Sequence, residues 1–248
     1  MRRLAALLVL LASVATASAE DLPRSGLDYA TPGIRAMQAD DFQNPGMLWV
    51  AEGRALWDQV GGMGSTSCAS CHGPIESMAA ISYPRRDPRD PERLMNLETR
   101  IEKCRTDNMG APPLGYESRE LLALTAAIRH QSRGRAVAVA ADDEAIARGE
   151  REFRRRRGAL DLSCAQCHEA NAGKQLRDET ISQGQTNGFP AYRLRWQGIG
   201  SLHRRFQVCN SAVLAEPYPP GSQEYIALEW FLAWRGRGLK VETPAVRQ

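Results

Sequence analysis

Cys68-Ala69-Ser70-Cys71-His72 and Cys164-Ala165-Gln166-Cys167-His168 share the pattern Cys-x-x-Cys-His, and this pattern decides how the chain is interpreted. It is typical of covalent attachment of c-type haem. Two thiols three positions apart can each add to one haem vinyl group, which places the adjacent histidine beneath the iron as its proximal ligand. A redox dithiol followed by an incidental histidine can explain one copy of the pattern. Two such copies in a chain with an export signal are improbable on that explanation. The sequence therefore predicts two c-type haems, attached through Cys68, Cys71, Cys164 and Cys167, with His72 and His168 on the irons.

The N-terminus predicts export. Met1-Arg2-Arg3 is positively charged, residues 4–14 are apolar, and Ala17-Ser18-Ala19 matches a signal-peptidase site. The apolar run is too short to cross a bilayer, and no other stretch approaches that length. We therefore expect a signal peptide at residues 1–19, cleavage after Ala19, a periplasmic location and no membrane span.

The composition of the 248 residues narrows the class further. The chain is 43% hydrophobic and 25% charged, which excludes both a disordered tail and a multi-span membrane protein. A net charge of +3 is too small to predict nucleic-acid binding. The aromatic content of 6% is low for two well-filled cores, so we expect the porphyrins to occupy part of the interior.

An internal repeat relates the two halves of the chain. When Cys68 is placed on Cys164, Arg100-x-x-x-Cys104 matches Arg205-x-x-x-Cys209. The same alignment places Gly53 on Gly149, Trp57 on Phe153, Glu120–Leu124 on Glu224–Leu228, and Arg133-Gly134 on Arg237-Gly238. The repeat predicts two tandem cytochrome c-like domains related by duplication, over residues 20–141 (with a linker at 135–141) and 142–248.

The expected fold class is all-α. Helix-forming composition or helical spacing of apolar residues predicts helices over 47–59, 118–131, 143–157 and 222–234. No run of alternating residues is long enough to predict a sheet of any size. Each half is therefore expected to wrap its helices around one haem.

The sequence identifies the sixth ligand of each iron less directly. All seven methionines lie at or before Met109, so the second haem has none in its own half. Its remaining candidates are His203, a lysine or Cys209; those of the first haem are Met78, Met95, Met109, His130 and Cys104. Only Cys104 and Cys209 occupy equivalent positions in the repeat, which favours thiolate ligation at both irons. The alternative is a Cys104–Cys209 disulfide, the usual state of two spare cysteines in an exported protein.

Two Cys-x-x-Cys-His motifs, each followed by Arg-x-x-x-Cys, with Arg205-Phe-Gln-Val-Cys209-Asn around the second, resemble the SoxA family. SoxA is the larger subunit of the SoxAX cytochromes of bacterial sulfur oxidation. The resemblance implies an L-cysteine S-thiosulfotransferase that joins thiosulfate oxidatively to a cysteine of a SoxYZ-like carrier. It also implies a SoxX-like haem partner, with electrons leaving to a small acceptor cytochrome. His72 with Cys104, and His168 with Cys209, would be the iron ligands; Cys209 would be the catalytic cysteine, able to carry a persulfide, and Arg205 the catalytic arginine.

Two interpretations stay open at this point. Arg205 can bind the sulfonate of thiosulfate or pair with a haem propionate, and Arg100 occupies the same place in the first half. The main alternative function is a dihaem electron carrier without a substrate site, and a dihaem peroxidase is weaker. The run Arg154–Arg157 indicates a solvated helix face or a docking site for an acidic partner.

Overall fold

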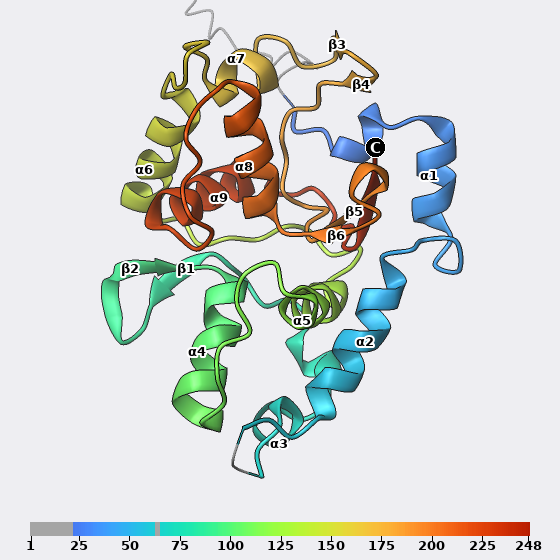
Figure 1. Cartoon of the computed structure of the whole chain (residues 1–248), viewed down its shortest axis with the longest axis vertical. Helices are drawn as coiled ribbons and strands as arrows, with labels where there is room; N and C mark the ends of the chain where they lie inside the picture. Colours follow the sequence, from blue (N-terminus) through green and yellow to red (C-terminus); the bar gives the residue numbers. More distant parts are fainter. Residues whose placement is uncertain (1–21, 63–64) are drawn as a thin grey trace, which may run out of the picture.

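The computed structural model describes residues 22–62 and 65–248. The predicted signal peptide lies outside these residues. Two groups of helices follow one another along the longest axis of the molecule, with α2–α5 at one end and α6–α9 at the other (Figure 1). No helix in the described ranges is both long enough and apolar enough to cross a membrane.

The first group is built on a close crossing of two helices. Helix α2 (Met47–Asp58) packs against α5 (Arg119–His130). Gly53 permits the contact, because a Cβ there would lie 2.0 Å from the carbonyl oxygen of Ala123. Helix α3 (Cys68–His72) follows α2, and α4 (Leu97–Met109) precedes α5. The shared core includes Trp57, Leu121 and Ile128, and Cys68 packs at its edge.

The second group repeats this construction. Helix α6 (Asp143–Arg154) packs against α9 (Gln223–Arg235), and a Cβ on Gly149 would lie 2.0 Å from the carbonyl oxygen of Ala227. Helix α7 (Cys164–His168) follows α6, and α8 (Leu202–Ala212) precedes α9. Phe153, equivalent to Trp57, lies in the core, and Cys164 packs at the edge.

Helix caps recur at matching positions. Asn96 caps α4 through the Thr99 amide, and Ser201 caps α8 through the Arg204 amide. Each cap lies eight residues before the cysteine of the Arg-x-x-x-Cys sequence. The same local chemistry therefore starts both cysteine-bearing helices.

The two groups meet through reciprocal hydrogen bonds between equivalent segments. The Gly134 amide donates to the carbonyl of Val241 (2.9 Å), and the Gly238 amide donates to the carbonyl of Val137 (3.2 Å). A second reciprocal set runs from Val137 to Leu239 and from Val241 to Arg135. This exchange is the pattern of a two-fold interface, here within one chain.

Short sheets join the helices, although the sequence gives no periodic signal for them. Strands β1 (Arg85–Asp87) and β2 (Asp90–Met95) form one antiparallel hairpin, and β3 (Gln175–Leu176) and β4 (Glu179–Thr180) form another. The third sheet has the order β6-β5-β7, built from Gly198–Gly200, Ala191–Arg193 and Ala245–Arg247. Strands of two to six residues are too short for alternation to be recognised.

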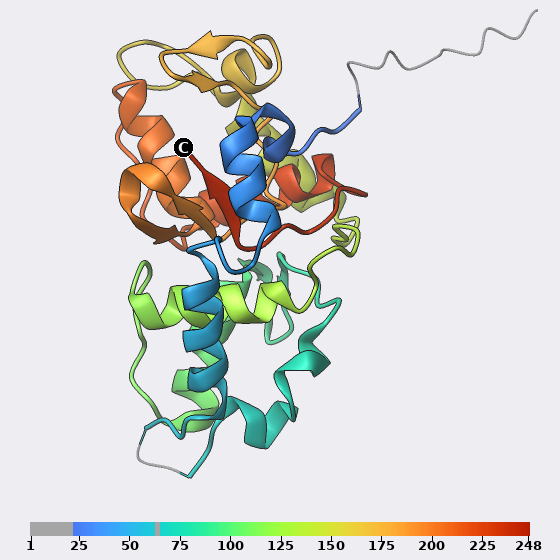
Figure 2. The same cartoon turned by 90° about the vertical axis from the view of Figure 1, so that its right-hand side faces the viewer.

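The N-terminal segment packs on the second helix group. Helix α1 (Pro32–Ala39) contacts β7 (Figure 2), and three 3₁₀ turns complete the fold at Gly26–Tyr29, Ile75–Met78 and Leu194–Trp196. Asn44 donates to the carbonyl of Pro244 (2.9 Å), which ties the start of the first group to the C-terminus. The predicted helices are therefore present within a few residues. The described part of the chain is mainly helical and carries three small sheets, so it is not purely α.

Candidate functional site

Each Cys-x-x-Cys-His motif forms a single helical turn with the same reciprocal cap. In α3 the Ser67 hydroxyl accepts from the Ser70 amide, and the Ser70 hydroxyl accepts from the Ser67 amide. In α7, Ser163 and Gln166 exchange the equivalent bonds. Such a capping box fixes the turn, so the two thiols and the histidine of each motif project from one rigid unit.

His168 is oriented by its surroundings. Its Nδ1 donates to the carbonyl of Ser182 (2.7 Å), which leaves Nε2 as the free ring nitrogen. Gly184 packs against the ring, since a Cβ there would lie 3.1 Å from Cγ of His168. The imidazole also lies close enough to the thiol of Cys209 to influence its pKa, so His168 and Cys209 face one another.

Cys209 lies in α8, one helical turn after Arg205, and is partly buried. Burial of the Cys209 thiol raises its pKa. The charge of Arg205, the adjacent His168 side chain and the charge of Arg193 together outweigh burial and lower the pKa to about 7. The surroundings of Cys209 therefore stabilise a thiolate.

Two guanidinium groups share one carboxylate beside Cys209. Nη2 of Arg193 lies 2.9 Å from Oε1 of Glu179, and Nη2 of Arg205 lies 3.7 Å from Oε2 of the same residue. The Arg193 side chain is only 7% exposed. Burial and the neighbouring Arg205 lower the pKa of Arg193 to about 10, still high enough to keep it charged at neutral pH. The site thus presents two cations to an anion next to a thiolate.

The sequence prediction missed Arg193 and Glu179. The Arg-x-x-x-Cys pattern marks Arg205, but Arg193 lies on strand β5 and Glu179 on strand β4, with no fixed spacing to Cys209. The sequence offers only a weak signal for these two residues, because they are one arginine and one acid among the polar residues between His168 and Arg205.

The first motif has different neighbours. Cys104, in α4, lies close enough to Cys68 for its charge, after burial, to raise the pKa of the Cys68 thiol. Arg105 acts in the opposite direction on the same thiol. The ring of His72 packs against Trp57 at a centroid distance of 5.8 Å, and Trp57 donates from Nε1 to the carbonyl of Gly73 (2.9 Å).

Cys104 and Cys209 lie beside different Cys-x-x-Cys-His motifs. All six cysteines are free, and α3 and α7 lie at opposite ends of the molecule (Figures 1 and 2). Cys209 influences the pKa of Cys164 and Cys167, whereas Cys104 influences that of Cys68. The alternative Cys104–Cys209 disulfide is therefore not formed. Ligation by Cys104 and Cys209 stays a prediction.

Two other ligand candidates are engaged elsewhere. His203 is 1% exposed, stacks on Tyr116 and accepts at Nδ1 from the Gly221 amide (3.0 Å). The Nδ1 atom of His130 bonds to the carbonyl of Thr243 (3.1 Å). Both histidines therefore make contacts between the two halves of the chain.

The residues of the second site fit a c-type haem. Two cysteines for attachment lie on one capped turn, and a histidine with a defined free nitrogen faces a thiol across the site. The described residues contain no group of three or more histidine, cysteine or acidic side chains able to hold a bare metal ion. A porphyrin, which needs only axial ligands from the protein, is consistent with this donor set.

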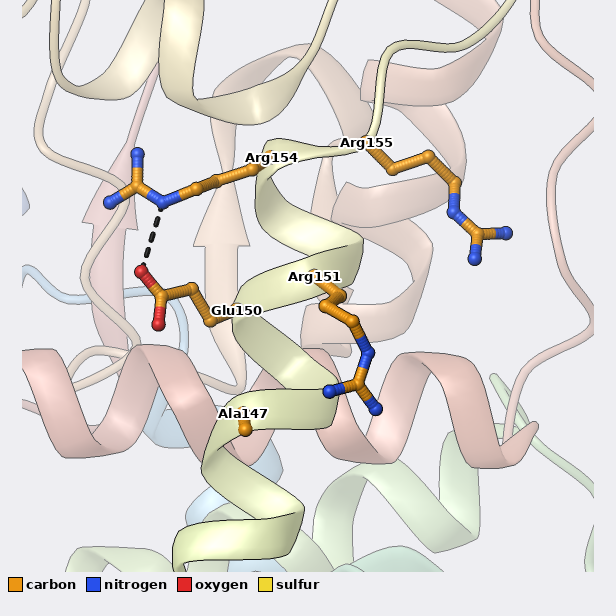
Figure 3. A pocket seen from close by; sticks show the side chains of 5 residues that line it. All are labelled: Ala147, Glu150, Arg151, Arg154 and Arg155. Atoms are coloured by element: carbon orange, nitrogen blue, oxygen red, sulfur yellow. Dashed lines mark hydrogen bonds and ion pairs between the residues drawn. The ribbon is translucent and has the colours of Figure 1, made fainter.

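The arginine run at residues 154–157 is largely paired. Arg154 bonds Glu150 (2.9 Å), and Arg156 bonds Asp161 (2.8 Å). Figure 3 shows the side chains of Arg151 and Arg154 projecting from α6 and that of Arg155 from the residue just after it, with Arg154 directed to Glu150. Of the run, only Arg154 belongs to the helix, and residues 155–157 lie beyond its end, so the predicted helix face covers one of the four arginines. Docking of an acidic partner stays a prediction.

Comparison with known proteins agrees with this geometry. Residues 52–137 match the SoxA/TsdA cytochrome c domain, which includes the first motif and Cys104. The SoxA subunit of L-cysteine S-thiosulfotransferase from Pseudaminobacter salicylatoxidans is 42% identical over 231 residues, covering 90% of this chain and 80% of that protein. The corresponding subunit from Rhodovulum sulfidophilum is 40% identical with the same coverage.

A solved structure extends the likeness to three dimensions. A chain in the crystal structure of SoxXA from P. pantotrophus superposes with a TM-score of 0.88 at 38% identity, covering 91% of this chain and 87% of that one. The chain therefore belongs to the SoxA family, the cytochrome c subunit of L-cysteine S-thiosulfotransferase.

Proposed function

We propose that this chain is the haem-bearing subunit that joins thiosulfate oxidatively to a cysteine of a SoxYZ-like carrier protein. One observation carries the proposal: His168, Arg205 and Arg193 converge on the single thiol of Cys209. An electron carrier has no use for an oxidisable thiol flanked by two buried or half-buried cations. The names of the relatives supply the reaction class.

We also propose that the chain carries two haems in two tandem cytochrome c-like domains, over residues 20–141 and 142–248. The matched caps, the matched glycine contacts and the reciprocal hydrogen bonds support a duplication. Cys68, Cys71 and His72, with Cys104, would hold the first haem. Cys164, Cys167 and His168, with Cys209, would hold the second.

Thiosulfate would enter as a replacement for a carboxylate. Glu179 bridges Arg193 and Arg205 when no substrate is present, with its oxygens 2.9 and 3.7 Å from the two guanidinium groups. A sulfonate offers three oxygens to the same donors, and guanidinium groups bind such planar or tetrahedral oxyanions in forked geometry. Binding in this place would direct the sulfane sulfur toward Cys209.

The overall step balances as a two-electron oxidation. A carrier thiol and thiosulfate form one sulfur–sulfur bond, release one proton and give up two electrons. Haem iron, when bound, supplies an electron acceptor beside the site. Cys209 holds the sulfane sulfur, and the carrier thiolate takes over the group by exchange at sulfur. Arg193 and Arg205 hold the negative charge of the sulfonate throughout.

The expected partners follow from this step. A SoxX-like haem subunit would complete the enzyme, and the structure of SoxXA shows such an assembly for the P. pantotrophus protein. A small cytochrome would accept the electrons. The predicted signal peptide supports a periplasmic location, where an exported carrier would meet the site.

Reconstitution tests the proposal. The haem-loaded chain, with a SoxX-like subunit, is incubated with thiosulfate and a carrier bearing one cysteine, and the carrier is weighed by intact-protein mass spectrometry while haem reduction is followed optically. We expect a thiosulfate adduct on the carrier, formed in step with haem reduction, and a labile sulfur adduct on Cys209 that the carrier thiol removes. Haem reduction without any adduct would assign the chain to the electron carriers.

A further inference from the structure

A small cavity lies where the two helix groups meet. It measures about 40 Å³, room for at least one water molecule. Its lining comes from both groups: Leu97 and Glu98 from α4, Thr125 and Arg129 from α5, Leu202 from α8 and Glu229 from α9. Leu97 and Leu202 are each the first residue of a cysteine-bearing helix, so the cavity lies between the starts of α4 and α8.

Titratable groups gather here at positions that the repeat relates. Glu98 lies six residues before Cys104, and His203 lies six residues before Cys209. Each is therefore about 9 Å along its helix from the cysteine. Both helices approach Glu229, whose Oε2 lies 3.2 Å from Nε2 of His203 and 3.1 Å from Nδ2 of Asn96.

An unpaired hydroxyl in the cavity indicates an internal water molecule. Thr125 is 2% exposed, and its Oγ1 has no hydrogen-bond partner among the described residues. A buried hydroxyl without a partner is costly, and a cavity of this size beside it is the usual place for a bound water. Glu98, 7% exposed, lines the same space and can share that water.

The charges around Glu98 come from every neighbouring element. Glu229 on α9 and Glu117 on the segment before α5 oppose a charge on Glu98, while Arg129 on α5 favours it. Tyr116 on the same segment stays a neutral phenol, because burial and then Glu98 raise its pKa. Tyr83, which precedes β1, also lines the cavity. His203 on α8 contacts Glu229, with its Nε2 3.2 Å from Oε2 of that residue. Burial, then Glu229, raise the pKa of Glu98 to about 8, against a weaker opposing effect of its own helix amide and Arg129.

We propose that this cavity is a proton-binding site shared by the two halves, in which Glu98, with a water held by Thr125, gains a proton when the haem irons gain electrons. The inference rests on the haem-loaded state proposed above. Each electron would add one negative charge near Cys104 on α4 or Cys209 on α8, and the Glu98 carboxylate then binds one proton from solvent to become a neutral acid. No other bond forms or breaks. The site makes the affinity of the irons for electrons depend on pH.

Redox potentiometry of the haem-loaded chain at a series of pH values tests this inference. In the wild type we expect the midpoint potential to fall as pH rises through the range in which Glu98 titrates, and to be level outside that range. Glu98→Gln, which cannot ionise, should lose this pH-dependent shift. Glu92→Gln removes the same charge from an exposed position on β2 and should retain it. Equal pH dependence in the wild type and in Glu98→Gln would overturn the proposal.

A measurement on the wild type avoids dependence on a variant that fails to fold. The reduced-minus-oxidised infrared spectrum, recorded at a pH within the range in which Glu98 titrates, should contain a protonated-carboxyl band that shifts in D₂O. A spectrum without that band contradicts the inference. A haem assay on the same sample separates this failure from that of the proposed function: too little haem contradicts the haem-loaded state itself, whereas full haem content with no carboxyl band contradicts only the proton site.

Discussion

The two Cys-x-x-Cys-His sites have the same local construction but different surroundings. Both motifs are capped single turns, and both are approached by a cysteine eight residues after a helix cap. At the second site, His168 faces Cys209 and two guanidinium groups share Glu179. The first site has Cys104 beside Cys68 without an equivalent pair of arginines around a carboxylate in the described part of the chain.

One position explains much of this difference. Arg193 is the third residue of the first strand in the hairpin that precedes α8, and Asp87 is the third residue of the first strand in the hairpin that precedes α4. The Asp87 carboxylate pairs with Lys103 at 2.9 Å, next in sequence to Cys104. Asp87 thus offers a carboxylate where Arg193 offers a guanidinium group. We expect the second site, and not the first, to bind thiosulfate, because an acid at this position repels an anion. The exchange of one charged residue would then separate a substrate site from a plain haem site.

Replacement of Cys104 or Cys209 should produce the largest difference in activity between the two sites. We expect Cys209→Ala to reduce thiosulfate-dependent electron transfer by more than about 10³-fold, because it removes the reacting sulfur. Cys104→Ala leaves Cys209 and both arginines in place and should retain turnover well above that of Cys209→Ala. Steady-state assays with an acceptor cytochrome measure both. Each variant should keep its covalent haems, since the attachment cysteines are untouched; equal losses in the two variants would make the sites functionally alike.

The arginine pair should affect substrate binding more than chemistry. Arg193→Lys keeps the charge but loses the fork toward Glu179, and we expect KM for thiosulfate to rise by about tenfold or more, as loss of a charged hydrogen bond implies. Arg205→Ala should raise KM further. Arg100→Ala, the counterpart in the first half, is the matched control. If Arg100→Ala raises KM as much as Arg205→Ala does, both arginines serve haem propionates and the substrate role of Arg205 is wrong.

Arg86 forms ion pairs with two acids of the second half, Asp142 and Glu144, and the pair with Asp142 has a defined pH dependence. Arg86 on β1 binds Asp142, the cap of α6, at 2.6 and 3.0 Å. The hydrogen bond from Arg86, with the Ala145 amide, lowers the pKa of Asp142 below its usual 3.8. We expect Asp142→Asn to lower the free energy of unfolding by about 1–2 kcal/mol at neutral pH. Because the folded pKa is the lower one, this contribution is present above 3.8 and disappears as pH falls through the folded pKa.

Denaturant unfolding across that pH range measures the effect. The difference between wild type and Asp142→Asn should shrink on acidification. A difference that stays constant to low pH would show that the ion pair does not contribute. A transition that splits in two in the variant would show that the halves unfold separately.

The smallest expected difference between the two sites concerns two glycines. Gly73 (φ +69°) and Gly184 (φ +73°) both need a left-handed backbone, so an alanine at either costs about 1 kcal/mol. A Cβ at Gly73 meets nothing within 4 Å, whereas one at Gly184 approaches the ring of His168. We expect Gly184→Ala alone to change the electron paramagnetic resonance spectrum of the haem-loaded protein, in addition to the shared loss of thermal stability. Identical spectra in the two variants would show that the Gly184 contact does not orient His168.

Much of the site could be predicted because the chemistry is encoded locally. Cys-x-x-Cys-His and Arg-x-x-x-Cys have fixed spacing, and spacing fixes which side chains share a helical turn. The main helices followed for the same reason. Arg193 and Glu179 could not be predicted, because they reach Cys209 from short strands whose positions depend on the hairpins and on packing.

By itself, the sequence determined the family and predicted the attachment cysteines and the repeat, since each depends on residues close together in the chain or on a match between two copies. Only the tertiary structure decided that Cys104 and Cys209 lie beside different motifs, that His168 faces Cys209, and that Glu98 and Glu229 share a cavity. The physical reason is that charge and burial act over distances in space. A buried arginine 16 residues from a thiol in sequence lowers the pKa of that thiol only when the fold brings the two together.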